Sequence, residues 1–249
     1  MKRILIALVL GISLLVASGG FVYAQDYQKG LEAAQKGNYA VAYWEWTVAA
    51  EQGDAVAQLF LGQMFFEGLG VLQDYKVAKM WFEKSASNNI SMAQNNLGLM
   101  YEQGKGVAQD QEEAVKWFRQ AAEQGIIQAQ FNLGLMYEQG KGVAQDLQKA
   151  AIWYQKAAVQ GDKNAQFNLG AFYFDEGGDL NLMYSYMWFK ISLENGVNIA
   201  KENVDFLKTK MSSSHLEKAD FFIYECLKKQ RGCLERLAHM TFNPLTQNR

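Results

Sequence analysis

The chain repeats itself with a period of 36 residues. Residues 93–110 read AQNNLGLMYEQGKGVAQD, and residues 129–146 repeat this string with one change. Looser copies at the same spacing begin at Ala57 and at Ala165. A period between about 20 and 50 residues is typical of stacked arrays, in which each unit buries its core against its neighbours. The sequence therefore predicts a repeat array.

Each unit has the pattern of a helical hairpin. Its apolar residues recur at helical spacing in two runs, which a glycine-bearing connection separates. In the unit from Ala129, Gly134 removes a side chain where the second helix must approach, and Gly140 suits the left-handed end of the first helix. Asp146 is expected to cap the start of the second helix. These features predict an all-α fold of stacked antiparallel helix hairpins.

Tryptophans recur in the second helices of the units. Trp81, Trp117 and Trp153 lie 36 residues apart, and Trp188 follows 35 residues later. We expect each indole to fill the junction between consecutive hairpins, against paired alanines of a neighbouring turn. A ligand-binding aromatic box is the alternative interpretation, which the regular spacing within a repeat disfavours.

The repeated pattern is Ala-Gln-x-x-Leu-Gly-x-Met-Tyr-x-x-Gly-x-Gly-Val-x-x-Asp, followed by Ala-x-x-Trp and Ala-Ala-x-x-Gly. This pattern resembles the Sel-one-like repeat family, longer-period relatives of the tetratricopeptide repeat. The resemblance covers residues 27 to about 229. Asn89 departs from it where other units have glycine, and the unit from Ala165 lacks the Gly-x-Gly-Val connection. The resemblance implies a right-handed α-solenoid used for protein–protein contact and, for bacterial members, a periplasmic or secreted adaptor.

The first 24 residues have the three parts of a secretory signal peptide. Basic Lys2 and Arg3 precede an apolar run from Ile4 to Val16, and small residues lead to Ala24. We expect cleavage after Ala24, no membrane insertion of the mature chain, and a periplasmic or secreted location. A retained anchor is the alternative, but the apolar run is short for a membrane-spanning helix.

The repeat register divides the rest of the chain. In the first hairpin, Tyr43, Trp44 and Trp46 are expected to pack in the core, with contact to a partner as the alternative. Ser214 and Glu217 have the spacing of a capping box that opens a last long helix. The expected segments are a signal peptide at 1–24, a capping hairpin at 25–56, repeats at 57–92, 93–128, 129–164 and 165–199, C-terminal capping helices at 200–240 and a flexible tail at 241–249.

Composition and motifs argue against catalysis and against several partner classes. Without residues 1–24 the chain has 22 basic and 26 acidic residues, a charge of −4 that favours neither nucleic acid nor an anionic membrane surface. The histidines are His215 and His239, and no nucleophile with a base is evident. The Gly104-Lys105-Gly106 turn follows a helix, unlike a phosphate loop. The acidic connection 175–181 lacks the spacing of a calcium loop. We expect no enzyme activity, no metal and no cofactor.

Cys226 and Cys233 are the two cysteines of the chain. In an exported protein an even count is first interpreted as a disulfide. Seven residues of unbroken helix span about 10.5 Å, whereas bridged Cα atoms lie roughly 4.4 to 6.8 Å apart. A Cys226–Cys233 disulfide therefore requires a helix break, which Gly232 could provide. Two free thiols are the alternative.

The first helix of each hairpin is expected to line the inner surface of the array. Its outward positions mix apolar and acidic side chains, and apolar residues not needed by the hairpin's own packing suit a peptide or protein partner. Packing of these aromatics against neighbouring helices is the alternative. Two other functions fit the sequence: a cell-wall-active enzyme or regulator of peptidoglycan metabolism, and a secreted host-interaction factor. The sequence does not indicate an oligomeric state. The predicted partner-binding groove comprises Asn95, Leu99, Glu102, Phe131, Leu135, Glu138, Phe167 and Phe174.

Overall fold

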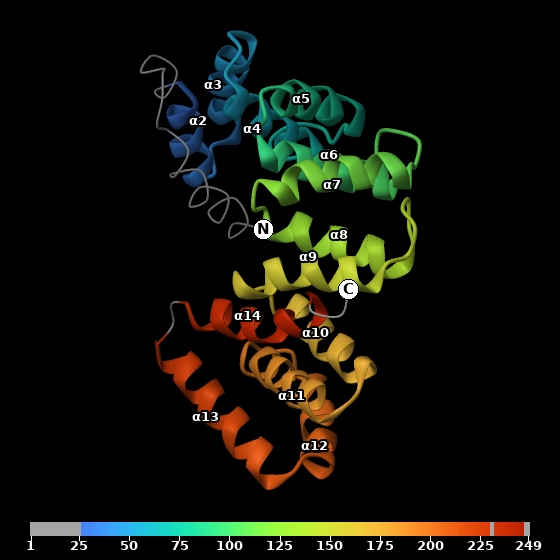
Figure 1. The fold of residues 1–249 in the computed structure, drawn as a ribbon. Helices are drawn as coiled ribbons and strands as arrows, with labels where there is room; N and C mark the ends of the chain where they lie inside the picture. The colour runs from blue at the N-terminus through green and yellow to red at the C-terminus, as the bar shows by residue number, and fades with distance from the viewer. Residues whose placement is uncertain (1–25, 230–231, 247–249) are drawn as a thin grey trace. The chain divides into compact units, whose positions relative to one another are not determined.

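The computed structural model describes residues 26–229 and 232–246, and every regular element within them is an α-helix (Figure 1). The all-α prediction is confirmed. The predicted signal peptide lies outside the described residues. The helices are α2 (Asp26–Gln35), α3 (Tyr39–Glu51), α4 (Ala55–Glu67), α5 (Tyr75–Ser87), α6 (Ser91–Gln103), α7 (Gln111–Glu123), α8 (Ile127–Gln139), α9 (Leu147–Val159), α10 (Lys163–Glu176), α11 (Asp179–Glu194), α12 (Ala200–Lys210), α13 (Ser213–Lys229) and α14 (Cys233–Thr246).

The chain forms two compact units, residues 1–117 and 118–249, with the boundary inside α7. The first unit contains the hairpins α2–α3 and α4–α5, followed by α6. The second contains the hairpins α8–α9 and α10–α11, followed by α12, α13 and α14. In the part of the chain that the structure describes, no helix is both long and apolar enough to cross a membrane.

Each hairpin closes where a glycine of its first helix meets an aromatic ring of its second helix. A Cβ atom added at Gly134 would lie 2.5 Å from the Tyr154 ring, closer than real Cβ contacts allow. The prediction that Gly134 permits close helix approach is confirmed. The same contact recurs in three other hairpins, with rings 2.4 to 2.7 Å from the added atom, between Gly30 and Trp46, Gly62 and Phe82, and Gly170 and Phe189.

The Gly-x-Gly connection is a backbone turn between helices. Gly104 ends α6 with a φ of 69°, and Gly106 has a φ of 71° where a Cβ atom would lie 2.5 Å from the backbone of Tyr75. Asp110 accepts the backbone N–H of Glu113 at 3.0 Å, as an N-cap does. Asp110 and Glu113 have the spacing of a capping box, but only half of it forms. The Glu113 carboxylate pairs with Lys116 at 2.8 Å, and the Asp110 N–H donates to the Tyr101 carbonyl.

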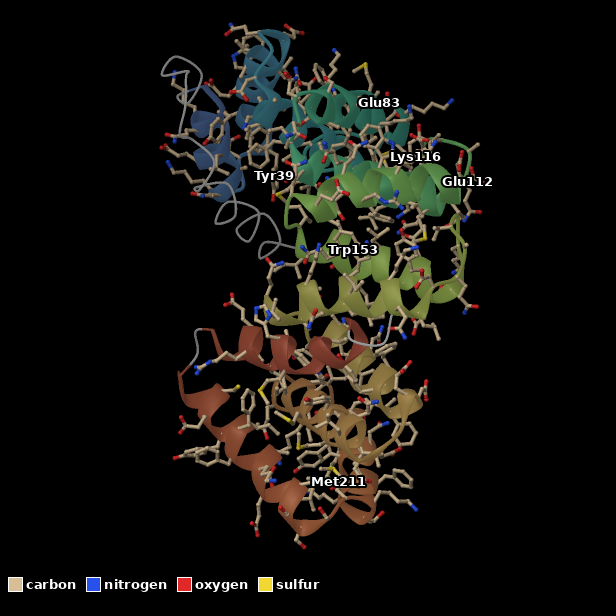
Figure 2. The ribbon with its side chains drawn as sticks, viewed as in Figure 1. Tyr39, Glu83, Glu112, Lys116, Trp153 and Met211 are labelled. Carbon is tan, nitrogen blue, oxygen red and sulfur yellow. The ribbon has the colours of Figure 1, made fainter. Side chains whose placement is uncertain are left out.

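The tryptophans are buried to different extents, whereas the residue after each tryptophan is always buried. Trp81 is 9% exposed and packs in one cluster with alanines of α3, while Trp117 packs against the cluster around Phe82. Both contacts match the predicted junctions. Trp153 on α9 is only half-buried (Figure 2), whereas Trp188 is completely buried. The deepest column consists of the residues that follow the tryptophans, each at most 2% exposed: Phe82, Phe118, Tyr154 and Phe189.

The glutamine of the Ala-Gln motif joins consecutive hairpins. Gln130 and Gln166 are buried, and each donates its amide N–H to a carbonyl of the preceding second helix at 3.1 Å. Gln58 makes the same 3.1 Å bond to Ala50 in the first unit. These bonds satisfy the last carbonyls of a helix, which have no partner within it.

The C-terminal helices return to the last repeats of their unit. Tyr186 of α11 donates to Asp220 of α13 at 2.7 Å, and α14 lies beside α9, where Gln155 donates to the Ala238 carbonyl at 2.6 Å (Figure 1). α13 is capped by Ser212, which accepts the His215 N–H at 3.3 Å, rather than by the predicted Ser214. α14 continues to Thr246, into the segment predicted to be a tail.

The helix break predicted between the cysteines is present. α13 ends at Lys229, α14 begins at Cys233, and Gly232 has a φ of 76°. Cys226 is buried, but the Cys233 side chain is not among those described, so the disulfide stays a prediction.

Candidate protein-binding surface

In the first unit, the predicted groove positions differ in exposure. Leu99 and Glu102 are half-buried on α6 and keep part of their surface open. Asn95 is 8% exposed. This corrects the expectation for Asn95, because a buried amide offers a partner little surface. The prediction rested on the repeat register, which gave Asn95 the same position as Phe131 and Phe167. In the first unit this position is buried, since Leu59, one repeat earlier, is 1% exposed.

In the second unit, the predicted aromatics pack partly inside their own hairpins. The Phe131 ring lies 5.8 Å from the Tyr154 ring, and the Phe167 ring lies 5.1 Å from the Phe189 ring. Both phenylalanines are half-buried, as is Leu135. Each side chain therefore supports the fold with one face and leaves the other open to a partner.

Glu138 is held in place by a neighbouring phenol. Tyr154 donates its hydroxyl proton to the Glu138 carboxylate at 2.8 Å. Burial raises the pKa of Tyr154, and the hydrogen bond to Glu138 raises it further, so the phenol keeps the proton that it donates. Glu138 is half-buried and therefore presents a carboxylate with a fixed orientation.

A cavity of about 210 Å³ lies where α10, α11 and α12 meet. Phe174 is 40% exposed and Phe206 is 47% exposed, and their rings meet edge to face at 6.0 Å. Buried Phe189 and Leu207 complete the apolar lining, and Glu202 and Asn203 supply its polar groups.

Sequence reasoning found Phe174 but missed the residues of α12. Residue 200 stands 35 residues after Ala165, at the start of what would be the next unit. Counted from there, Glu202 occupies the position of Phe167, and Phe206 occupies the position of Ala171, the counterpart of Leu135 in the preceding unit. Extending the repeat register by one more helix would therefore have placed both residues on the predicted binding face.

A second exposed apolar surface lies on α3. Trp46 is buried and donates its indole N–H to the Tyr27 carbonyl at 2.9 Å. Trp44 is 67% exposed, and Val41 and Val48 on the same side of the helix are 43% and 40% exposed. Core packing is thus correct for Trp46, whereas Trp44 faces outward.

The described residues offer little material for metal or acid–base chemistry. Within them, no three histidine, cysteine, aspartate or glutamate side chains are grouped so as to hold a metal ion. His215 is half-buried beside the α13 cap, and His239 is exposed on α14.

Comparison with known proteins assigns the family. The Sel1 repeat model matches residues 55–90, 91–126, 127–162 and 163–197, more than half of the chain, and these matches begin at the first residues of α4, α6, α8 and α10. Among curated proteins, none matches the chain.

Two solved structures are similar in sequence and in fold. A Sel1 repeat protein from Oxalobacter formigenes is 31% identical with a TM-score of 0.67, over 72% of this chain and 74% of that chain. The protein c5321, a protective antigen present in uropathogenic Escherichia coli strains that displays an SLR fold, is 29% identical with a TM-score of 0.72. That match covers 99% of this chain and 52% of c5321, so the chain spans about half of the antigen's length. The chain therefore belongs to the Sel1 repeat family and has its all-α solenoid fold.

Proposed function

We propose that this protein is a non-catalytic scaffold that binds a peptide or protein surface on the outward faces of its first helices. Sel1 repeats generally mediate contacts between proteins, which supports a protein partner. The proposal goes further by naming the face and by excluding catalysis.

The observation that carries the proposal is the partial exposure of apolar side chains on α8 and α10. Phe131, Leu135 and Phe167 are half-buried, although the core positions beside them, such as Leu133 and Leu169, are completely buried. Each half-exposed apolar residue exposes surface that association would remove from water at about 25 cal/mol per Å². An apolar surface of this kind can receive the apolar face of an amphipathic peptide helix.

Replacing Phe131, Leu135 and Phe167 together with serine tests the proposal. The triple variant should lose capture of the natural partner from extracts of the producing cells, while far-UV circular dichroism shows unchanged helix content. A matched control replaces Leu147 and Phe221, which are 50% and 70% exposed elsewhere in the same unit, and should capture normally. Undiminished capture by the triple variant would move the binding site to another face.

We further propose that the protein acts outside the cytoplasm, in the periplasm or as a secreted protein. The leader-like residues 1–24 support this location, and so does the description of c5321 as a protective antigen, since an antigen is accessible to antibodies. Cell fractionation, with mass spectrometry of the mature N-terminus, tests it. An intact Met1 in the cytoplasmic fraction would contradict the proposal.

The rival function is action on the cell wall. Incubation of the pure protein with peptidoglycan fragments should leave them unchanged in chromatographic analysis. Turnover would replace the scaffold proposal with an enzymatic one.

A further inference from the structure

The cavity between α10, α11 and α12 is the right size for one side chain. Its volume of about 210 Å³ is below the roughly 300 to 1,000 Å³ of pockets that hold whole small-molecule ligands. It exceeds the roughly 150 Å³ of an apolar cavity that accepts benzene. The lining suits the same occupant, because Phe189 and Leu207 form a buried apolar floor and the Phe174 and Phe206 rings stand partly exposed above it.

The charged side chain that lines the cavity is acidic. Glu202 lines it, is exposed, and forms no ion pair with any described residue, and Asp175 follows Phe174 in the last turn of α10. The carboxyl end of α10 contributes partial negative charge, and the amino end of α12, where Glu202 lies in the first turn, contributes partial positive charge. Nearby cations are already engaged: Lys201 and Lys208 each lie 3.6 Å from Asp205, and Lys210 stands 5.3 Å from the centre of the Phe206 ring.

We propose that this cavity receives a single large apolar side chain, phenylalanine or leucine, from a partner peptide that carries lysine or arginine next to it. The apolar side chain fills the space above Phe189, between the Phe174 and Phe206 rings. The neighbouring cation meets the Glu202 carboxylate at the rim. This inference rests on the proposed function and assigns its main anchor, since Glu202 and Phe206 continue the positions of Phe167 and Ala171 into α12.

A matrix of synthetic peptides tests the anchor. Nine-residue capped peptides of glycine and serine, labelled with fluorescein, carry phenylalanine, leucine or alanine at the centre and lysine, glutamine or glutamate on both sides of it. Binding to the full chain is followed by fluorescence anisotropy, and the place of binding by the methyl resonances of Leu207. The lysine-flanked phenylalanine peptide should bind most tightly and shift Leu207. A central alanine should weaken binding at least about 10-fold, because it removes the buried side chain.

Variants of the lining separate the two parts of the recognition. Phe206→Ser and Phe174→Ser should each weaken the phenylalanine peptide about 10-fold or more, because both rings line the site. Glu202→Gln should remove the preference for lysine over glutamine, a loss of about 2- to 5-fold that salt also screens. Phe221→Ser is the matched control, since Phe221 is 70% exposed on α13 and does not line the cavity; it should bind as the wild type does.

Several results would overturn the inference. One is equal binding of the phenylalanine and alanine peptides. Another is an equal loss of peptide affinity in Phe206→Ser and Phe221→Ser. A third is no peptide binding at concentrations up to about 1 mM, which corresponds to a binding free energy of only about 4 kcal/mol. Capture of the natural partner tells this failure from failure of the proposed function. If the Phe131, Leu135 and Phe167 triple variant loses capture but Phe206→Ser does not, the scaffold function stands and the anchor is wrong. If neither loses capture, the proposed function fails too.

Discussion

The hairpins α8–α9 and α10–α11 belong to the same unit, and they share their packing but not their connection. Both bring a first-helix glycine against an aromatic ring, Gly134 against Tyr154 and Gly170 against Phe189. Between α8 and α9 the chain makes the long Gly-x-Gly turn and caps α9 with Asp146. Between α10 and α11 it has only Gly177 and Gly178, and no side chain caps α11. The helix contact therefore holds the hairpin, and the connection is free to vary.

The two hairpins also differ in what covers their second helices. α11 contacts both α12 and α13, and its Trp188 and Tyr186 are completely buried. Trp153, at the equivalent position of α9, stays half-buried with the Lys156 ammonium 4.1 Å from its ring centre. The closing helices thus turn a repeat position into a core position. They also create the cavity beside Phe206.

The largest contrast should appear when the equivalent tryptophans are truncated. Trp188→Ala should lower the free energy of unfolding by about 3 to 5 kcal/mol, because it leaves a cavity in a closed core. Trp153→Ala should cost about 2 kcal/mol, since part of the ring already faces solvent. Urea unfolding followed by circular dichroism measures both. Trp188→Phe is the control and should cost less than Trp188→Ala, since it keeps an aromatic ring in the core. It also removes an indole N–H that has no partner among the described residues. Equal losses at Trp188 and Trp153 would show that the closing helices add no packing.

The predicted disulfide tests how firmly the closing helices are fixed. If Cys226 and Cys233 are bonded, replacing both with serine should lower the free energy of unfolding by about 2 to 3 kcal/mol. Mass spectrometry after alkylation without reductant should find neither cysteine alkylated. Recovery of two alkylated cysteines would refute the bond.

The shared glycine contact should respond alike in the two hairpins. Alanine at a helix interior normally stabilises by about 1 kcal/mol relative to glycine. Gly134→Ala and Gly170→Ala should instead each destabilise by about 1 to 3 kcal/mol, because the new Cβ atom would lie 2.5 or 2.7 Å from an aromatic ring. Thermal and urea unfolding measure the change, and a double-mutant cycle with Tyr154→Leu should show that the cost at Gly134 depends on that ring. A stabilised Gly170→Ala variant would mean that the two hairpins close differently.

The smallest effect should separate the two connections. Asp146→Ala should cost about 1 kcal/mol, whereas Asp179→Ala should change the free energy of unfolding by only a few tenths, because Asp179 makes no cap bond. The Lys149 backbone N–H, which donates to the carboxylate, lowers the pKa of Asp146, and so does the Lys149 side chain. The ionised Asp146 cap therefore stabilises the folded state fully above the unfolded-state pKa of about 3.9. This stabilisation is lost as the pH falls through the lower pKa that Asp146 has in the folded state. Asp146→Asn keeps a hydrogen-bond acceptor and should lower the free energy of unfolding by less than Asp146→Ala does. The difference in free energy of unfolding between the wild type and Asp146→Ala should shrink in acid. A difference independent of pH would rule out the ionised cap.

Much of the candidate binding face could be predicted from the repeat register. The register placed Leu99, Phe131, Leu135 and Phe167 on first helices with part of their surface open, because helical spacing fixes which positions share a face. It failed at Asn95, where the side chain turns into the core despite its polarity. The predicted groove also ended at Phe174 on α10 and did not include Glu202 and Phe206 of α12.

The sequence by itself determined the hairpins, their glycine contacts and their caps, because these depend on residues close together in one 36-residue period. Only the tertiary structure decided that Trp188 is buried and Trp153 is not, that α14 returns to α9, and that Phe174 and Phe206 meet beside a cavity. These features depend on which helix covers which face. The apolar pattern of one helix records that a face is covered but does not identify the helix that covers it.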